Sequence, residues 1–546
     1  MSLICAKHQN LMRNFLVNLF VLVCLVLAFE SCANRGTPTG GDKDIEPPVI
    51  IKFEPENFST KFNGEEIRIY FNEYVKFKDL QKQLIISPPM DPEPEITPLG
   101  LASKYISIKI LDTLLPNTTY AINFGTSVVD NNEENPFPYL RYVFSTGDYI
   151  DSLSVRGYVK NSLEKETDKF VSVMLYEVDS TYTDSVIFKQ KPKYITNTLD
   201  STTNFTLENL KAGKYLMVAL KEDNVNFTFE PKTDKIGFLK DFITVTEDSS
   251  FYELNLFKEV PDFRATRPFL VSGNKIGFGY EGNADEMKID IISNVSEDFQ
   301  SIITKDKETD TLYYWFKPDQ EVDSLLFKVT NKAYVDTLKI NLRTLDKDSL
   351  LVTPVGSRSL RLTEDFKLEG NIPFIEIDES KITFLDKDSI NVSFVTSFNQ
   401  LKNQYSFKFD KTELNTYRIQ ALPEAFTDFF NNKNDTLNFN TRTKEQSDYG
   451  NIRVNIQNGV YPLIIQLVDQ KGEVVMERYA KQAGPIDFLD INPGNYEMRA
   501  IFDTNGNGKY DTGNYLLKQQ PERVSYITDL EEVRAYYDQV IEFILQ

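Results

Sequence analysis

The sequence has very little cysteine and histidine, and both residue types are confined to its first 32 positions. The three cysteines are Cys5, Cys24 and Cys32, and the single histidine is His8. If the chain is cleaved before Cys32, the remainder has no histidine and no free thiol. This absence excludes Ser-His-Asp and Cys-His catalysis, His-ligated zinc, thiolate metal sites and structural disulfide bonds. We therefore expect a protein without enzymatic activity, whose domains are held together by hydrophobic burial.

Basic residues are in the minority, because 60 Lys and Arg face 81 Asp and Glu, for a formal net charge of −21 at pH 7. No stretch concentrates positive charge in the way that a phosphate backbone requires, so nucleic acid is excluded as a partner. The acidic surface also disfavours contact with anionic lipid faces, except through a dedicated anchor.

Low-complexity composition is absent as well, since Gly 24 and Pro 24 are ordinary numbers for 546 residues. Hydrophobic residues make up 41% of the chain and aromatic residues 13%, which is enough to fill several cores. At about 100–150 residues per domain, the length predicts four or five modules.

The N-terminus has the pattern of an export signal. An apolar run spans residues 15–29, follows the basic residues Lys7 and Arg13, and is too short for a membrane-spanning helix. Ser31-Cys32 after this run resembles the lipobox of bacterial lipoproteins, although Phe29 stands where leucine is usual; loose boxes of this kind are typical of the Bacteroidetes. The resemblance implies a signal peptide over 1–31, lipidation of Cys32, and a polar tether over 32–46. It also implies an outer-membrane location, with the membrane face left open.

Most of the remaining sequence alternates between apolar and polar residues. This period of two is the signal of half-buried antiparallel strands, and helical periodicity is scarce. An amphipathic helix is an alternative for the C-terminal segment 529–546, but its β-rich end favours a closing strand. We therefore predict an all-β fold of tandem β-sandwiches in an elongated array. The clearest alternating segments are Ile67–Phe71, Tyr105–Ile110, Tyr215–Leu220 and Ile452–Ile456.

Two kinds of internal repeat divide the chain into modules. The segment Leu115–Ile122 is echoed by Leu414–Ile419, and related strands ending in threonine follow both. A second pair, Phe205–Ala219 and Ile486–Ala500, shares a strand, a glycine turn, and tyrosine followed four residues later by alanine. The first kind predicts the first, third and fourth modules at 47–147, 259–345 and 346–444. The second kind predicts the second and fifth modules at 148–258 and 445–546.

These segments resemble two known families. Ile67–Val75, Leu115–Ile122 and Val143–Thr146 are similar to the S-layer-type (SbsA) bacterial Ig-like domain, which often opens Bacteroidetes lipoproteins. The two modules with the glycine-tyrosine repeat resemble the transthyretin-like fold of carboxypeptidase regulatory domains. The resemblance implies Ig-like and transthyretin-like sandwiches, and it implies no activity, because such folds carry many functions.

One loop has the residue spacing of a calcium site. Asp503, Asn505, Asn507 and Asp511 place oxygen side chains at alternating positions, with Gly508 at the sixth position. Asn514 stands where an EF-hand has its bidentate glutamate, and an Asn/Gly turn between two strands explains the same residues. Calcium bound by these four side chains is therefore a hypothesis; no other cofactor is expected.

Two other features have an ordinary structural interpretation. Several Asp-Ser/Thr-apolar triplets resemble an O-glycosylation sequence of exported Bacteroidetes proteins, but a turn that leads into a strand explains them equally. Trp315 is the sole tryptophan and lies in an aromatic cluster, which favours a strand core over a platform for sugars.

Three functional hypotheses remain. The leading one is a lipid-anchored structural and interaction subunit that docks on an outer-membrane β-barrel protein, together with other lipoproteins. The alternatives are a cell-surface adhesin or envelope structural protein, and a glycan-binding surface lipoprotein. All three place the modules beside the outer membrane and none requires catalysis.

Overall fold

The computed structural model describes residues 43–198, 202–247, 251–527 and 530–546, and within them almost all regular structure is β. This confirms the predicted all-β fold of tandem sandwiches. The predicted closing strand is also confirmed, since β41 (Asp538–Ile544) ends the fifth module. The helical elements are short turns: α2 (Leu80–Gln83), η1 (Asp184–Phe188), η2 (Glu379–Lys381) and η3 (Gln446–Asp448).

The first module is a sandwich of two antiparallel sheets, β1-β2-β5-β4 with β7 beside β2, and β3-β6-β8. Along β2 the side chains of Ile67 and Ile69 are fully buried while Arg68 between them is exposed, so the alternation in the sequence directs one face inward. The strands are β1 (Ile50–Glu54), β2 (Glu66–Phe77), β3 (Ile85–Ser87), β4 (Glu95–Thr97), β5 (Ser103–Lys109), β6 (Thr119–Gly125), β7 (Val128–Asp130) and β8 (Leu140–Ser145).

The second module has the strand order β11-β10-β13-β14-β16-β9-β12, with β15 beside β13. Its closing strand β16 runs parallel to its first strand β9, and the other pairs are antiparallel. The strands are β9 (Leu153–Asn161), β10 (Ser172–Glu177), β11 (Tyr194–Asn197), β12 (Asn204–Leu210), β13 (Gly213–Lys221), β14 (Lys235–Phe238), β15 (Ile243–Val245) and β16 (Phe251–Lys258).

Among the described residues, the fifth module repeats this topology except that it lacks a counterpart of β15 and of the pairing between β14 and β16. Its sheets are β38-β35-β41 and β37-β36-β39-β40, and β41 again runs parallel to the first strand β35. The repeat detected in the sequence covers β12 and β13 in one module and β38 and β39 in the other. The remaining strands are β35 (Gly450–Gln457), β36 (Leu463–Val468), β37 (Val474–Ala480), β38 (Ile486–Ile491), β39 (Glu497–Phe502) and β40 (Val524–Tyr526).

The third module pairs the sheet β17-β19-β22-β21, with β18 beside β19, with the sheet β20-β23-β24. Its buried side chains form one cluster that includes Phe278, Leu325 and Phe327. The strands are β17 (Arg264–Ala265), β18 (Phe269–Ser272), β19 (Lys275–Glu281), β20 (Lys288–Ile291), β21 (Gln300–Lys305), β22 (Thr311–Lys317), β23 (Ser324–Asn331) and β24 (Tyr334–Asn341).

The fourth module contains the sheets β25-β27-β31-β30 and β26-β34-β32-β29, with the small pair β28-β33. Phenylalanine rings from both large sheets stack in its core. The strands are β25 (Val352–Val355), β26 (Ser359–Leu360), β27 (Phe366–Gly370), β28 (Phe374–Ile377), β29 (Ile382–Leu385), β30 (Phe394–Asn399), β31 (Gln404–Phe409), β32 (Thr416–Ala421), β33 (Phe426–Asp428) and β34 (Leu437–Thr443).

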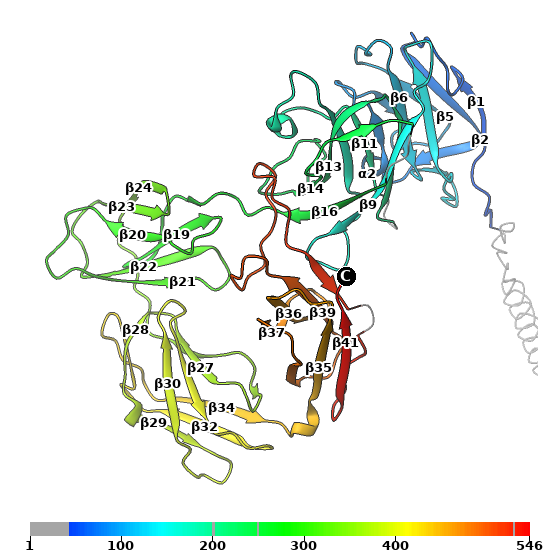
Figure 1. Ribbon diagram of the computed structural model, residues 1–546. Helices are drawn as coiled ribbons and strands as arrows, with labels where there is room; N and C mark the ends of the chain where they lie inside the picture. Colours follow the sequence, from blue (N-terminus) through cyan, green and yellow to red (C-terminus); the bar gives the residue numbers. More distant parts are fainter. Residues whose placement is uncertain (1–42, 199–201, 248–250, 528–529) are drawn as a thin grey trace, which may run out of the picture.

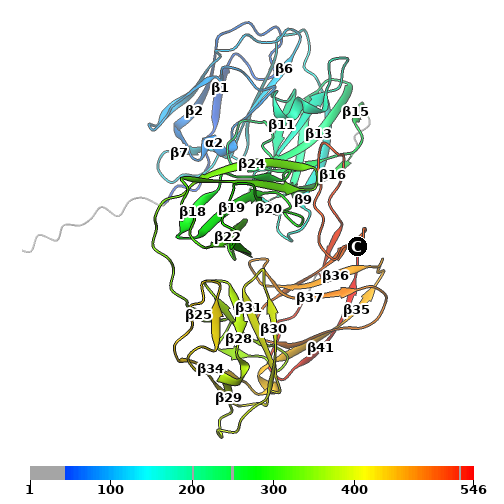
Figure 2. The same ribbon diagram turned by 90° about the vertical axis from the view of Figure 1, so that its left-hand side faces the viewer.

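The modules do not follow one another in a line, and this differs from the expected elongated array. The third module leads away from the second, the fourth turns downward, and the fifth turns back so that its loop reaches the second module again (Figure 1). In the view turned by 90°, the fourth and fifth modules lie together below the other three (Figure 2). The second to fifth modules therefore form a closed circuit, to which the first module is attached through the second.

Polar contacts join the consecutive modules of this circuit. Lys232 of the second module pairs with Glu281 of the third at 3.0 Å. Between the third and fourth modules, the Lys305 backbone N–H donates to the Leu401 carbonyl at 2.7 Å. The fourth and fifth modules are joined by a hydrogen bond of 3.2 Å from the Thr363 hydroxyl to the Asp490 carboxylate.

Candidate functional site

Several predicted features lie in residues that the structure does not describe, so it does not test them. The signal peptide, Cys32 and most of the tether lie outside the described residues. In the described part of the chain, no helix combines the length and the apolar character needed to cross a membrane. Lipidation of Cys32 and location at the outer membrane therefore stay predictions.

Trp315 lies at the boundary of the third and fourth modules, where it is only 2% exposed. It packs in one cluster with Ile372 and Phe429 of the fourth module. Its indole N–H donates to the Thr304 hydroxyl at 3.0 Å, so its polar group is satisfied as well. This confirms that Trp315 is a core residue, and it removes the residue as a platform for sugars.

The predicted calcium residues all lie in one long loop between β39 and β40, residues 503–523, which we call the insertion loop. Asp503 is completely buried and begins this loop directly after β39. Its carboxylate accepts backbone N–H bonds from Gly506 at 2.8 Å, Asn507 at 3.1 Å and Gly508 at 2.8 Å. Gly506 and Gly508 adopt φ values of 75° and 74°, which favour glycine. The Asn/Gly turn considered from the sequence is therefore present.

The structure brings the other predicted residues together around Asp511. Its carboxylate accepts hydrogen bonds from the side-chain amides of Asn505 at 2.5 Å and Asn507 at 2.8 Å. Among the described residues, no group of three or more His, Cys, Asp or Glu side chains is arranged to hold a metal ion. The side chains of Asn505 and Asn507 converge on Asp511, whereas the Asp503 carboxylate is occupied by backbone N–H groups, so calcium binding stays a prediction.

Glu522 completes the base of the loop and was missed in the sequence. It is 7% exposed, and its carboxylate accepts the Thr504 N–H at 2.6 Å and the Asp511 N–H at 3.1 Å. Its position just before β40 is matched in the second module by Asp234 just before β14, which is 3% exposed. Aligning the two repeats beyond their shared segment would have identified this pair of buried carboxylates.

The pKa of Asp503 shows that the loop favours the charged form. Burial opposes ionisation, but hydrogen bonds from the Tyr479 hydroxyl and the loop N–H groups outweigh it and lower the pKa below its ordinary value. In the second module, Glu222 follows β13 as Asp503 follows β39. Burial raises the pKa of Glu222 to about 7, and one of its carboxylate oxygens has no hydrogen-bond partner among the described residues.

The far end of the insertion loop enters the second module. Tyr515 is completely buried there and packs edge-on against Phe238, with ring centroids 5.3 Å apart. Its backbone N–H donates to the carboxylate of Glu259, and Lys518 lies 4.0 Å above its ring while pairing with Asp184. The apolar residues that surround Tyr515, here called the outer core, come from both sides of β13 and from the loops around it: Met174, Tyr176, Ile187, Leu216, Val218, Leu220, Phe229, Ile236, Phe238 and Phe257.

The position of Asn514 explains why the loop departs from the EF-hand pattern. Asn514 lies at the far end of the insertion loop, where its backbone N–H and carbonyl form hydrogen bonds of 2.9 Å with the backbone of Gln519. The residue at the twelfth position thus serves the contact with the second module and lies apart from the turn around Asp503.

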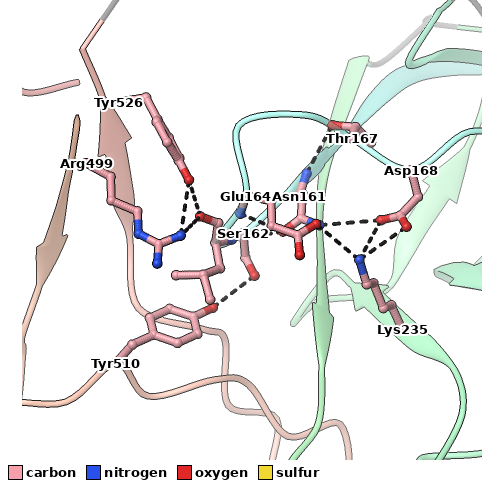
Figure 3. Close-up of polar contacts among 10 residues, drawn as sticks. Asn161, Ser162, Glu164, Thr167, Asp168, Lys235, Arg499, Tyr510 and Tyr526 are labelled. Atoms are coloured by element: carbon pink, nitrogen blue, oxygen red, sulfur yellow. Dashed lines mark hydrogen bonds and ion pairs between the residues drawn. The ribbon is translucent and has the colours of Figure 1, made fainter. Parts of the chain in front are cut away.

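A second contact runs in the opposite direction, from the second module into the fifth (Figure 3). The carbonyl of Leu163, in the turn after β9, accepts hydrogen bonds from the Arg499 guanidinium at 3.0 Å and the Tyr526 hydroxyl at 2.6 Å. Beside it, the hydroxyls of Ser162 and Tyr510 lie 2.9 Å apart. Arg499 is 5% exposed, and its Nε donates to Gln466 at 2.7 Å, so the buried cation is oriented from two sides.

The turn that carries Leu163 is fixed within the second module. The Asn161 backbone N–H donates to the Thr167 hydroxyl at 3.2 Å, and Lys235 pairs with Asp168 at 3.0 Å (Figure 3). Lys235 on β14 therefore helps to orient the turn that meets the fifth module. On the other side of the contact, Arg499 lies on β39 and Tyr526 on β40.

The sequence did contain a signal for this contact. The prediction that Tyr215–Leu220 is a half-buried alternating strand was wrong, because in β13 this run is buried at every position, and all six residues of β36 are buried as well. A strand of an antiparallel sandwich with one solvent face alternates, whereas a strand covered on both faces is apolar throughout. These runs indicated that each module needs a cover on its outer face. The insertion loop contributes to one cover, and the turn at Leu163 to the other.

Comparison with known proteins identifies one part of the chain. Residues 44–146 match the sequence model of the family described as a bacterial Ig-like domain. The first module is therefore a bacterial Ig-like domain. No curated protein matches the chain, and the transthyretin-like fold of the second and fifth modules stays a prediction.

Solved structures give weaker similarities. The surface layer protein SbsC, domains 1–6, covers 89% of this chain and 67% of its own, with 11% identity and a TM-score of 0.15. The Bacillus anthracis TIE protein covers 93% and 76%, with 11% identity and a TM-score of 0.15. The BSP domain of a biofilm associated protein covers 86% and 96%, with 10% identity and a TM-score of 0.16. With TM-scores this low, the similarities assign no function to this chain.

Proposed function

We propose that the chain is a non-enzymatic envelope lipoprotein, anchored to the outer membrane through Cys32, that acts as a structural and interaction subunit and docks on an outer-membrane β-barrel complex. The observation that supports this proposal is the reciprocal contact between the second and fifth modules. It closes the second to fifth modules into one circuit, so the protein presents its surfaces in a fixed arrangement.

A fixed arrangement suits a docking subunit for an energetic reason. Binding costs free energy for every segment that becomes ordered, and a preorganised partner avoids much of this cost. The acyl chains of a lipoprotein add about 0.8 kcal/mol per buried CH₂ and hold the modules beside the membrane. An acidic surface limits unspecific adhesion to anionic headgroups.

A mild-detergent pull-down of the tagged lipoprotein from its own outer membrane tests the proposal. We expect one β-barrel protein and a few lipoproteins to be recovered in near-equal amounts, as measured by quantitative mass spectrometry. A Cys32→Ser variant, which cannot be lipidated, is the control for the anchor. Recovery of the lipoprotein alone would show that the docking proposal is wrong.

A second candidate, glycan binding, is favoured by the outer face of the first module. Tyr105 is 42% exposed and Tyr74 is 55% exposed, and Tyr70 lies directly across the sheet from Tyr105 with ring centroids 5.7 Å apart. Exposed rings on one sheet face can stack on sugar rings. Removing both exposed rings with Tyr74→Ala and Tyr105→Ala should then abolish retention in polysaccharide affinity electrophoresis. Unchanged mobility of the wild type in every gel would remove this candidate.

A further inference from the structure

The edge strands of a sheet expose unpaired backbone groups, and proteins normally protect them against pairing with other chains. In the part of the chain that the structure describes, every edge strand of five or more residues except β30 carries at least one charged residue. Such residues are Lys52 on β1, Arg141 on β8, Glu208 on β12, Lys305 on β21, Asp336 on β24, Glu477 on β37, Asp487 on β38 and Asp538 on β41.

Strand β30 lacks all of these protections. Its sequence from Phe394 to Asn399 is FVTSFN, without charge or proline, and its pairing with β31 shows no bulge. Within the described residues, none of its backbone groups makes a hydrogen bond outside that pairing. In Figure 2 it lies on the opposite side of the fourth module from the other edge strand, β25.

The outer face of β30 is open to solvent, whereas on its inner face Phe394 packs against the core and only the end of the strand is exposed. Val395 on the outer face is 71% exposed, and Phe398 on the other face is 39% exposed. Leu401, just beyond the strand, is 48% exposed. An added strand would find main-chain hydrogen bonds along β30 and one exposed apolar side chain on each face, Val395 and Phe398, which suits recognition by β-strand addition.

We infer that β30 is the edge through which the fourth module binds an extended segment of another protein by adding it as a further strand of the sheet β25-β27-β31-β30. This inference rests on the proposed function, because it names the surface that the subunit uses. The bound segment is expected to be extended, with apolar side chains at alternating positions. A second copy of this chain is disfavoured, because each copy has a formal charge of −21 and repels the other.

A crosslinking experiment on the full lipid-anchored protein in its own membrane tests the inference. A photoreactive benzoylphenylalanine replaces Ser397 on β30, and the matched control replaces Thr337 on the charged edge strand β24. We expect a discrete adduct from position 397 that maps to one extended segment of a subunit recovered in the pull-down. The amides of 394–399 should also exchange with deuterium more slowly in the membrane complex than in the purified protein. Position 337 should give no adduct.

Charge introduced on the edge provides the second measurement. Val395→Lys and Ser397→Lys replace exposed residues, so the fold should be retained, and circular dichroism checks this. We expect at least a tenfold loss of partner recovery for both, with Val335→Lys on β24 as the unchanged control. Undiminished recovery with the lysine variants would overturn the inference and leave the proposed function intact.

Two further outcomes distinguish a failure of the proposed function from a failure of the inference about β30. If the wild-type protein recovers no barrel partner, the proposed function fails. The inference about β30 then stands only if the adduct at 397 maps to an extended segment of another protein; without such an adduct it is overturned. If the adduct joins two copies of this chain, and sedimentation shows a dimer that Val395→Lys dissociates, the assignment of a different partner is overturned.

Discussion

The second and fifth modules share most of one topology but differ in the loop that follows their fifth strand, β13 or β39. In the second module this loop spans residues 222–234, and it contacts the third module through the ion pair of Lys232 with Glu281. In the fifth module it spans 503–523 and carries Tyr515 into the outer core of the second. Of two modules with similar strands, the fifth therefore inserts a loop and the second receives it. The longer loop of the fifth module determines these two roles.

The comparison also shows how one framework position acquires opposite electrostatics. Asp503 and Glu222 each follow the corresponding strand, yet three backbone N–H groups surround Asp503 whereas one oxygen of Glu222 has none. At Glu222 burial is the dominant cause and raises the pKa, whereas at Asp503 burial is outweighed by the hydrogen bonds from the Tyr479 hydroxyl and the loop N–H groups, which lower the pKa.

The largest expected effect comes from removing the ring that joins the two modules. Tyr515→Ala should destabilise the contact by about 3–5 kcal/mol, as large-to-small changes of buried aromatic residues do. The fifth module should then separate from the second, and small-angle X-ray scattering should detect a larger radius of gyration. Leu517→Ala, at a side chain that is 75% exposed, is the control. An unchanged radius in the Tyr515 variant would show that the polar contacts alone hold the circuit.

Breaking the turn at Asp503 should have the next largest effect. Asp503→Ala leaves three backbone N–H groups without their acceptor, and we expect a loss of about 2–4 kcal/mol in the free energy of unfolding. Because the folded-state pKa of Asp503 is lowered, its contribution is present above the unfolded value and is lost as the pH falls through the folded value. Urea unfolding from pH 3 to 7 measures both effects. A variant as stable as the wild type at pH 7 would contradict this account.

Glu222 should respond to pH in the opposite direction. Burial raises its pKa from 4.5 to about 7, so the folded state holds the proton more tightly than the unfolded state. Its contribution is therefore present below pH 4.5 and is lost as the pH rises to 7, by about 1–2 kcal/mol after allowance for partial exposure. Glu222→Gln should remove this decline in urea unfolding curves. A decline of the same size in the variant would assign it to other groups.

The reciprocal contact at Leu163 should contribute less. Tyr526→Phe removes one of the two hydrogen bonds to the Leu163 carbonyl, and we expect a loss of about 0.5–1.5 kcal/mol. Amide hydrogen exchange in the turn 162–168 should accelerate accordingly, while exchange near Tyr515 stays unchanged. Tyr536→Phe, at a residue that is 86% exposed, is the matched control.

Calcium should give the smallest effect, and only in the fifth module. If the insertion loop binds Ca²⁺, a concentration equal to the Kd stabilises the protein by about 0.4 kcal/mol. A thermal melt with and without the ion measures this shift, and Asp511→Ala should abolish it. Identical melting temperatures at millimolar Ca²⁺ would rule out the hypothesis.

Local patterns in the sequence predicted the strands but not the circuit. Ile67–Phe71 alternates in the sequence and lies within the single strand β2, and the glycine-tyrosine repeat lies on the strand pairs β12-β13 and β38-β39. Tyr515, by contrast, is followed by Leu516 and Leu517, which are both exposed, and nothing in the sequence indicates that Tyr515 alone of the three is completely buried. Contacts such as Arg499 with Leu163 join residues far apart in the chain, so no local periodicity records them.

The position of Tyr515 has a consequence for the second module while the protein is being synthesised. The second module emerges from the ribosome well before residue 515, so its outer core remains incomplete for the whole synthesis of the third and fourth modules. Joining such distant segments also carries an entropic cost that grows with the length of the intervening chain. During this interval the exposed apolar surface is a natural site for a chaperone, and synthesis stalled before residue 515 would leave a chain prone to aggregation.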